Sequence, residues 1–287
     1  MASGTLPSVA EHPQVTAFKR RQKVKRGALV LIALAFSALV MGVPVAAIFA
    51  RAFQEGVAVY WTNIVEPDTL YAIWLTVLTA LIVLPINIVY GVAVAWLITR
   101  YRFPGRRVLL TIIELPFSIS PIVAGLCYLL IYGGTSVIGS WADEWNIQLM
   151  FNLTGIVLVS LFVTCPFVAR ELIPLMQVSG KDQEEAALTL GATGWQTFRH
   201  VTLPNIRWAL LYGAILANAR VMGEFGAVSV VSGNIRGETM TLPLQVQLLY
   251  DDYNATGAFA AATVLTLIAV ITLVLRSLIE ARHPHRH

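Results

Sequence analysis

The chain has 287 residues, of which 57% are apolar and only 13% are charged. This composition is far from the mixture typical of soluble domains and predicts a polytopic membrane protein. The formal net charge is +4, but the basic residues are spread over segments that flank apolar runs instead of gathering on one soluble face. That distribution argues against a nucleic-acid partner.

Six charge-poor runs are each long enough to cross ~30 Å of hydrocarbon, for which a helix needs about 20 residues. They lie at residues 28–50, 71–99, 109–133, 151–176, 208–233 and 255–275. The first run follows a basic stretch, as a signal peptide would, but it is too long for a signal sequence and five runs follow it, so we interpret it as retained. The expected fold is all-α, a polytopic membrane protein with six transmembrane helices within residues 27–280.

The positions of Lys and Arg predict the orientation, because basic loops stay in the cytoplasm. Basic residues precede the first run and follow the second, fourth and sixth: Lys19, Arg20, Arg21, Lys23, Lys25 and Arg26, then Arg100, Arg102, Arg106 and Arg107, then Lys181, Arg199 and Arg207, and finally Arg276, Arg282 and Arg286. The three opposite loops hold only Arg51 and Arg236. We therefore expect both tails, residues 1–26 and 281–287, to be cytoplasmic.

The cysteine and histidine residues do not predict a metal site. Cys127 and Cys165 fall inside predicted spans and are interpreted as small buried apolar residues rather than as a disulfide or metal ligands. His283, His285 and His287 end the chain. A metal could bind this tail incidentally, but a solvated end is the preferred interpretation.

Two prolines interrupt the third apolar run. Pro116 and Pro121 each remove a backbone donor and bend a membrane helix, which is tolerated only where protein or water satisfies the freed carbonyl groups. Ser118 and Ser120 lie between them. We expect this bent segment, with its two serines, to line a pathway.

A polar island at residues 179–204 separates the fourth and fifth runs and is predicted to fold as two short helices. Asp182 is placed to cap the first helix, with Glu185 three residues later. Gly191 suits the left-handed conformation that ends a helix. The loop lies on the side predicted to be cytoplasmic.

The second helix of the island repeats this pattern. Thr193 is placed as its cap with Gln196 three residues later, and Pro204 is expected to end it after Leu203. The apolar residues of each helix share one face: Ala186, Ala187 and Leu190 in the first, and Trp195, Phe198 and Val201 in the second. Such small apolar faces suit docking into a groove of another protein.

The fifth run carries polar residues near mid-membrane, where a charge costs at least ~2.5 kcal/mol and should face the bundle interior or water. Arg220 and Glu224 are four residues apart, on one helical face, and can pair. One interpretation is a structural pair that locks packing. The other is that Asn218, Arg220 and Glu224 line an anion-tolerant pathway. Beyond this run, the outer segment 234–254 has its own apolar stretch at 242–250 and predicts a short interfacial helix that meets an external partner.

The island resembles the EAA loop of ABC importer permeases, the cytoplasmic element that sits in a cleft of the ATPase subunit. The matching positions are Glu185, Ala186, Ala187, Gly191, Leu203 and Pro204. The one departure is Val201, where the family more often has Ile. The resemblance implies that these residues couple the chain to its ATPase, that ATP and Mg²⁺ are used by the partner, and that this chain binds no cofactor.

Three further stretches, at residues 115–134, 165–176 and 203–245, look like the W-type permease of sulfate/thiosulfate importers, and the likeness extends over about 71–275. It implies a type I ABC importer transmembrane domain in a bacterial inner membrane. Its partners would be a second permease of the T type, two ATPase subunits, an extracytoplasmic sulfate/thiosulfate-binding protein and the lipid bilayer. Molybdate permeases share part of the 218–239 region, so a molybdate or tungstate permease is the alternative.

No catalytic machinery is visible in the sequence. Asp182 follows Gly180 and Lys181, which breaks the phosphate-binding pattern GxxxxGK[ST]. The expected function is a non-catalytic permease subunit that moves an oxyanion by alternating access. A proton-coupled secondary transporter using Glu114, Glu171 or Glu224 is a further alternative, although the matching halves typical of that class are not seen. An intramembrane enzyme would need polar groups that converge in the bilayer.

Overall fold

The computed structural model describes residues 13–282, which fall into two compact units that divide after Ala50. The first unit contains α1 (Pro13–Ser37), the π-helical turn η1 (Ala38–Gly42) and the beginning of α2 (Val43–Ala52). Residues 25–52 are apolar and long enough to cross a membrane, and none of the most apolar 18-residue window in this stretch is buried. Residues 1–12 of the predicted N-terminal tail and the His283, His285 and His287 tail lie outside the described residues.

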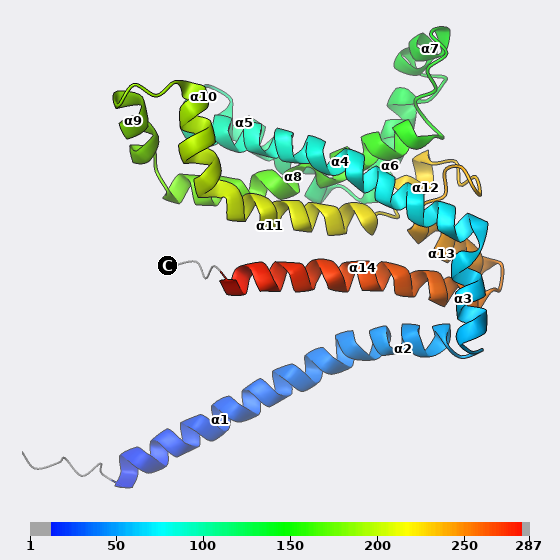
Figure 1. Ribbon diagram of the computed structural model, residues 1–287, viewed down its shortest axis with the longest axis horizontal. Coiled ribbons are helices and arrows are strands. Elements are labelled where there is room, and N and C mark those ends of the chain that lie inside the picture. The colour runs from blue at the N-terminus through cyan, green and yellow to red at the C-terminus, as the bar shows by residue number, and fades with distance from the viewer. Residues whose placement is uncertain (1–12, 283–287) are drawn as a thin grey trace, which may run out of the picture. The chain divides into compact units, whose positions relative to one another are not determined.

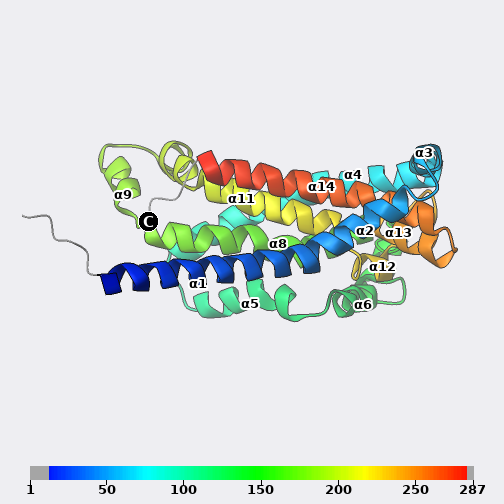
Figure 2. The same ribbon diagram turned by 90° about the horizontal axis from the view of Figure 1, so that it is seen from below.

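The second unit is helical throughout its described part (Figures 1 and 2). Its elements are α3 (Val57–Val65), α4 (Pro67–Arg100), α5 (Arg106–Ser118), α6 (Pro121–Tyr132), α7 (Val137–Glu144), α8 (Leu153–Val178), α9 (Asp182–Thr189), α10 (Gly194–Thr197), the π-helical η2 (Phe198–Thr202), α11 (Leu203–Met222), α12 (Val228–Val231), α13 (Leu242–Asp251) and α14 (Ala255–Arg282). The all-α prediction is confirmed.

Helices α4, α8 and α11 run side by side and form the centre of this unit. A Cβ atom on Gly91 of α4 would lie 2.6 Å from Val168 of α8, so the two backbones approach as closely as only glycine allows. Close by, Asn87 is 1% exposed and donates to Thr164 Oγ1 over 2.6 Å. This buried hydrogen bond fixes the register of α4 against α8.

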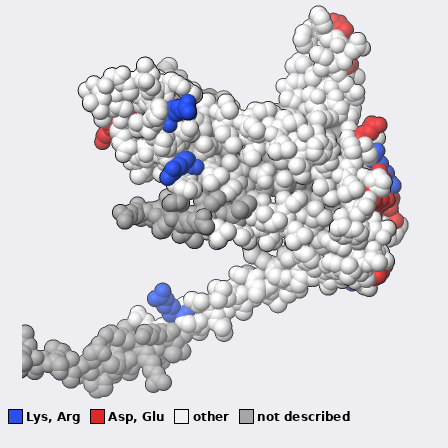
Figure 3. Space-filling view, in the orientation of Figure 1, with Lys and Arg blue, Asp and Glu red and all other residues white. Residues whose placement is uncertain are grey.

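The ends of the second unit differ in charge. On the face seen in Figure 3, most acidic side chains gather on α7 and at the end that carries α3 and α13, and Lys or Arg side chains lie beside α10 and α11 at the opposite end. This separation agrees with the sidedness that the loop charges predict.

The membrane spans follow the sequence prediction with two corrections. Among the described residues, four helices are long and apolar enough to cross a membrane, at 25–52, 67–100, 153–178 and 255–272. The third predicted span bends as its prolines indicate, but by 110°, so that it consists of α5 and α6 and counts as a fifth span only if this pair crosses together. The prediction of a continuous span at 208–233 is wrong, because α11 already ends at Met222 and its polar residues keep it below the hydropathy of the other spans.

The outer segment contains the predicted short helix, α13 (Leu242–Asp251). Several of its apolar residues are not free for an interface, since Leu242 and Leu249 are buried against Ala72, Ala258 and Ala261. The backbone N–H of Leu242 donates to Thr76 Oγ1 over 2.8 Å. The helix is therefore part of the core of the second unit.

Candidate functional site

The first helix of the polar island, α9, begins at its predicted cap residue, one position earlier than expected. Asp182 is the first helical residue and Lys181 is the N-cap without a side-chain hydrogen bond, so the prediction that Asp182 caps the helix is wrong. An acidic residue in the first turn still stabilises the helix, because the exposed backbone N–H groups carry partial positive charge.

The end of α9 is the one predicted from Gly191. This glycine has φ +89°. Its N–H donates to the carbonyl of Leu188, and the N–H of Ala192 donates to Ala187, each over 3.0 Å. These two bonds satisfy helix-end carbonyls and reverse the chain, which a residue with a Cβ atom does poorly.

The second helix starts at its predicted residue but continues past its predicted end. Thr193 accepts from the N–H of Gln196 and its own N–H donates to Gln196 Oε1, a complete capping box. Pro204 does not end the helix, contrary to the prediction. The π-turn η2 pairs the N–H of Leu203 with the carbonyl of Phe198, so the helix passes without a break into α11. A π-turn accommodates the proline because the wider spacing removes the bond that Pro204 cannot donate.

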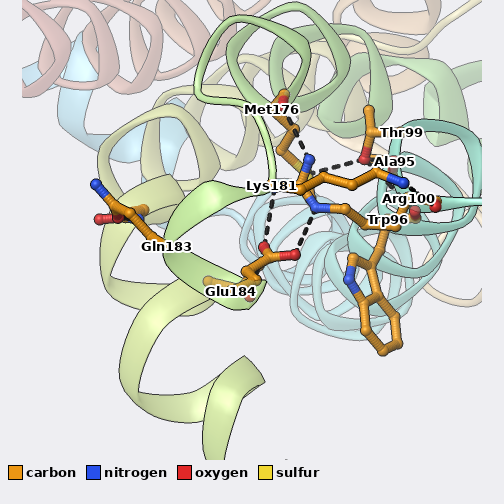
Figure 4. A network of polar contacts seen from close by, with 10 residues as sticks. Ala95, Trp96, Thr99, Arg100, Met176, Lys181, Gln183 and Glu184 are labelled. Carbon is orange, nitrogen blue, oxygen red and sulfur yellow. Dashed lines mark hydrogen bonds and ion pairs between the residues drawn. The ribbon is translucent and has the colours of Figure 1, made fainter. Parts of the chain in front are cut away.

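A network of charged and polar groups fixes α9 to the bundle (Figure 4). Arg100, the last residue of α4, contacts Glu184 of α9 through Nε–Oε2 at 2.7 Å and Nη2–Oε1 at 2.9 Å. Its Nη1 donates to the carbonyl of Met176 at the end of α8 over 3.0 Å. Lys181 Nζ donates to the Arg100 carbonyl over 2.6 Å, and Thr202 Oγ1 of η2 donates to Glu184 Oε1 over 2.8 Å.

We call these five residues, Arg100, Met176, Lys181, Glu184 and Thr202, the polar latch. The side chains of Arg100 and Glu184 are only 10% and 14% exposed, and a charge-assisted hydrogen bond between guanidinium and carboxylate is stronger than a neutral one. Gln183 points away from the latch and accepts from Asn205 over 2.5 Å. The latch thus joins α9 to α4, α8 and η2.

Most of the residues predicted to couple the chain to a partner lie free on the surface of the loop. Glu185, Ala186, Gly191 and Pro204 are exposed, and Ala187 and Leu203 are half-buried. Leu188 and Leu190 are large apolar side chains that are also exposed, Leu190 by 89%. The chain provides no cover for this surface among the described residues, as a docking element requires.

Sequence reasoning missed Glu184. It stands beside Glu185 in the run Gln183-Glu184-Glu185, and consecutive helical residues point about 100° apart. Only one of two adjacent acids can then face the bundle. Arg100, the basic residue at the end of the second predicted span, was the signal that could have identified the acid that faces the bundle.

The polar residues of the fifth run form a pair at a helix break. Arg220 Nη1 lies 2.8 Å from Glu224 Oε2, the predicted pairing. Glu224 is 2% exposed, and its Oε1 accepts from the N–H of Ala227 over 3.0 Å. Arg220 remains about one third exposed, and Asn218 Nδ2 contacts Met222 Sδ at 3.8 Å.

The two breaks in the helices pack against each other. A Cβ on Gly226 would lie 3.2 Å from Pro121, and one on Gly125 would lie 2.8 Å from the carbonyl of Ala227. Ser118 and Ser120 flank the bend between α5 and α6 and are exposed. The structure therefore brings the segments with Ser120 and Glu224 together.

Neither metal nor disulfide chemistry is visible in the described part of the chain. No group of three or more His, Cys, Asp or Glu residues is arranged to hold a metal among these residues. Cys127 and Cys165 are free thiols; Cys127 is exposed rather than buried, contrary to the prediction, and Cys165 is half-buried.

Residues 87–283 match the model of the family described as binding-protein-dependent transport system inner membrane component. The chain belongs to this family, and it is accordingly a membrane component of a transport system rather than an enzyme.

Within this family, the chain is 57% identical over 254 residues to the sulfate transport system permease protein CysW of Escherichia coli strain K12, which covers 88% of this chain and 87% of that protein. It is 37% identical over 246 residues to the sulfate transport system permease protein CysT of the same strain, covering 84% and 89%. A solved bacterial alginate ABC transporter in complex with a periplasmic protein shares the fold with a TM-score of 0.73 at 17% identity, covering 94% of this chain and 96% of that one.

Proposed function

We propose that this chain is the W-type permease subunit of an ATP-driven importer that carries sulfate or thiosulfate across the cytoplasmic membrane. The observation that carries the proposal is the likeness to CysW over nearly the whole length of both chains. The molybdate and proton-coupled alternatives find no comparable support. The coupling surface on α9 gives the proposal its mechanism.

The partners we propose are a second permease of the T type, two ATPase subunits and an extracytoplasmic sulfate/thiosulfate-binding protein. The likeness to CysT, at 37% identity, supports a pair of related but different permease chains. ATP and Mg²⁺ would act on the ATPase subunits, and this chain would bind no cofactor. Both termini and the loop at 179–204 would face the cytoplasm.

The electrical work explains the need for ATP. A dianion that enters a cell with a negative interior works against about 2.3 kcal/mol per charge per 100 mV, on the order of 5 kcal/mol before any concentration gradient. Passive entry fails against this barrier. Closure of the ATPase subunits would move α9 and open the helices outward, where the binding protein delivers the anion.

The polar latch gives a route for this movement. Because Glu184 holds Arg100 and Thr202, a displacement of α9 pulls on the end of α4 and on η2 together. The continuous helix from Gly194 to Met222 then transmits the displacement to the break that holds Arg220 and Glu224. In this proposal Ser118, Ser120, Asn218, Arg220 and Glu224 line the translocation path.

Reconstitution tests the proposal. The chain is expressed with its T-type permease, its ATPase and its binding protein, and the complex is placed in proteoliposomes containing internal ATP. We expect uptake of labelled sulfate that requires ATP and the binding protein and is inhibited by thiosulfate. Uptake that persists without ATP and collapses with an uncoupler would overturn the proposal, and uptake of molybdate but not sulfate would overturn the substrate assignment.

A further inference from the structure

An apolar groove of about 530 Å³ lies beside the coupling loop. One wall is a stripe of α4, and the other is formed by α10, η2 and α11. Its lining includes Val89, Ala93, Trp96, Trp195, Phe198 and Leu210. Val89 is 70% and Trp195 68% exposed, so the groove is open along its length.

The groove runs along the membrane-crossing part of α4. Its lining on α4 extends from Ile88 to Trp96, roughly 12 Å at 1.5 Å per residue. These residues belong to the second half of the span at 67–100. The groove therefore lies at hydrocarbon depth and approaches the polar end of the span.

Aromatic rings surround that polar end. Trp96 and Phe198 have ring centroids 5.8 Å apart, Phe198 and Trp195 5.6 Å, and Trp96 and Tyr101 6.1 Å. Trp and Tyr side chains concentrate at the level of lipid headgroups, because one end of each ring system is apolar and the other is polar. The ring cluster marks the interface between hydrocarbon and water.

Two basic residues adjoin the ring cluster in sequence. Arg199 follows Phe198 and is four residues after Trp195, and Arg102 follows Tyr101; both are exposed. The nearby acid Glu184 is occupied in the polar latch. A basic side chain at this depth favours an anionic headgroup by about 1 kcal/mol, or about fivefold.

The chemistry of the groove selects among occupants. Its lining residues are apolar, and basic residues adjoin the aromatic cluster at its polar end. A phospholipid combines an apolar chain with a charged headgroup, whereas an apolar helix of another chain offers no anionic group to this end. We propose that the groove holds one acyl chain of an anionic phospholipid, whose headgroup is bound by Arg199 and Arg102.

Native mass spectrometry of the intact importer complex tests the site with phosphatidylglycerol and phosphatidylcholine added in equal amounts. We expect the wild-type complex to retain phosphatidylglycerol over phosphatidylcholine. Ala93→Trp fills the groove and should abolish this retention, whereas Leu81→Trp, on an exposed part of α4 outside the groove, should leave it intact. Arg199→Gln should lower the preference for phosphatidylglycerol about fivefold, and Arg107→Gln, exposed on α5, should not.

A photo-crosslinking residue at position 89 identifies the occupant in native membranes. A lipid adduct supports the proposal. A crosslink to another protein chain would overturn it, as would equal retention of the two lipids or unchanged retention in Ala93→Trp. These readouts do not depend on transport, so a failure of the sulfate assignment would leave them unaffected.

Discussion

Arg100 and Glu184 join the end of α4 to α9 across 84 residues of sequence, through Nε–Oε2 at 2.7 Å and Nη2–Oε1 at 2.9 Å. Both side chains are largely shielded from water, so the pair is stronger than an exposed ion pair. The neighbouring acid, Glu185, is exposed. Two adjacent glutamates thus have different tasks, one that holds the loop to its own bundle and one that is free for a partner.

A double-mutant cycle on Arg100→Gln and Glu184→Gln measures the strength of this contact. We expect a coupling energy of about 1–3 kcal/mol in the unfolding free energy, as for contacting residues in one network. The matched control, Glu185→Gln, should change stability by less than about 0.5 kcal/mol, as exposed substitutions usually do. Equal effects of Glu184→Gln and Glu185→Gln on unfolding in detergent would contradict the assignment of the latch.

Glu185→Lys is expected to break coupling without unfolding the protein. The charge reversal occurs on an exposed side chain, so the variant should reach the membrane at the wild-type level. We expect loss of ATPase co-purification and of ATP-driven sulfate uptake. The coupling assignment fails if both persist.

Gly191→Val should also weaken ATPase binding, for a backbone reason. No atom lies within 4 Å of the added Cβ, but φ +89° is unfavourable for a β-branched residue and costs about 1–3 kcal/mol. Gly191→Asn is the control, because Asn tolerates the left-handed region. We expect Asn to preserve ATPase co-purification and Val to reduce it, and identical behaviour of the two variants would exclude the backbone explanation.

Gly91→Ala tests the contact between α4 and α8. The new Cβ would lie 2.6 Å from Val168, so the helices must move apart, at a cost of about 1–3 kcal/mol. Gly42→Ala meets nothing within 4 Å and serves as the control. Thermal unfolding should show a lower midpoint only for Gly91→Ala; an unchanged midpoint would mean that the helices yield without cost.

The double variant Arg220→Gln/Glu224→Gln separates a structural pair from a transport role. Removing Arg220 alone leaves Glu224 as a buried unpaired charge, which costs about 3–5 kcal/mol, and neutralising both residues avoids that penalty. We expect the double variant to fold, to retain ATPase stimulation by the binding protein and to lose sulfate uptake. Normal uptake would assign the pair to packing alone.

Several features of the loop could be predicted because they depend on short-range chemistry. The left-handed Gly191 and the Thr193–Gln196 capping box each follow from a few neighbouring residues, and both are present. Asp182 failed as a cap, because Lys181 occupies that position.

The outcomes that could not be predicted depend on contacts between distant segments. Pro204 indicates a helix end, yet the π-helical turn η2 accommodates this proline within a longer helix. Likewise, hydropathy indicated one span over 208–233, whereas Glu224 is buried at a break after Met222, where it accepts from Ala227 and pairs with Arg220. A local pattern does not reveal such partners, and the resemblance to a family supplied the predicted coupling residues but not Arg100.

The π-turn Phe198–Thr202 also sets the rotation of α11 about its own axis relative to Trp195. Deleting one residue there would turn α11 by roughly 100° about its axis relative to Trp195, moving Gly213 away from Val168 and Glu224 out of its pocket. This five-residue stretch consequently does not tolerate insertions or deletions. The tip of the loop around Leu190 can accept a tag or a reporter dye without changing the rotation of α11.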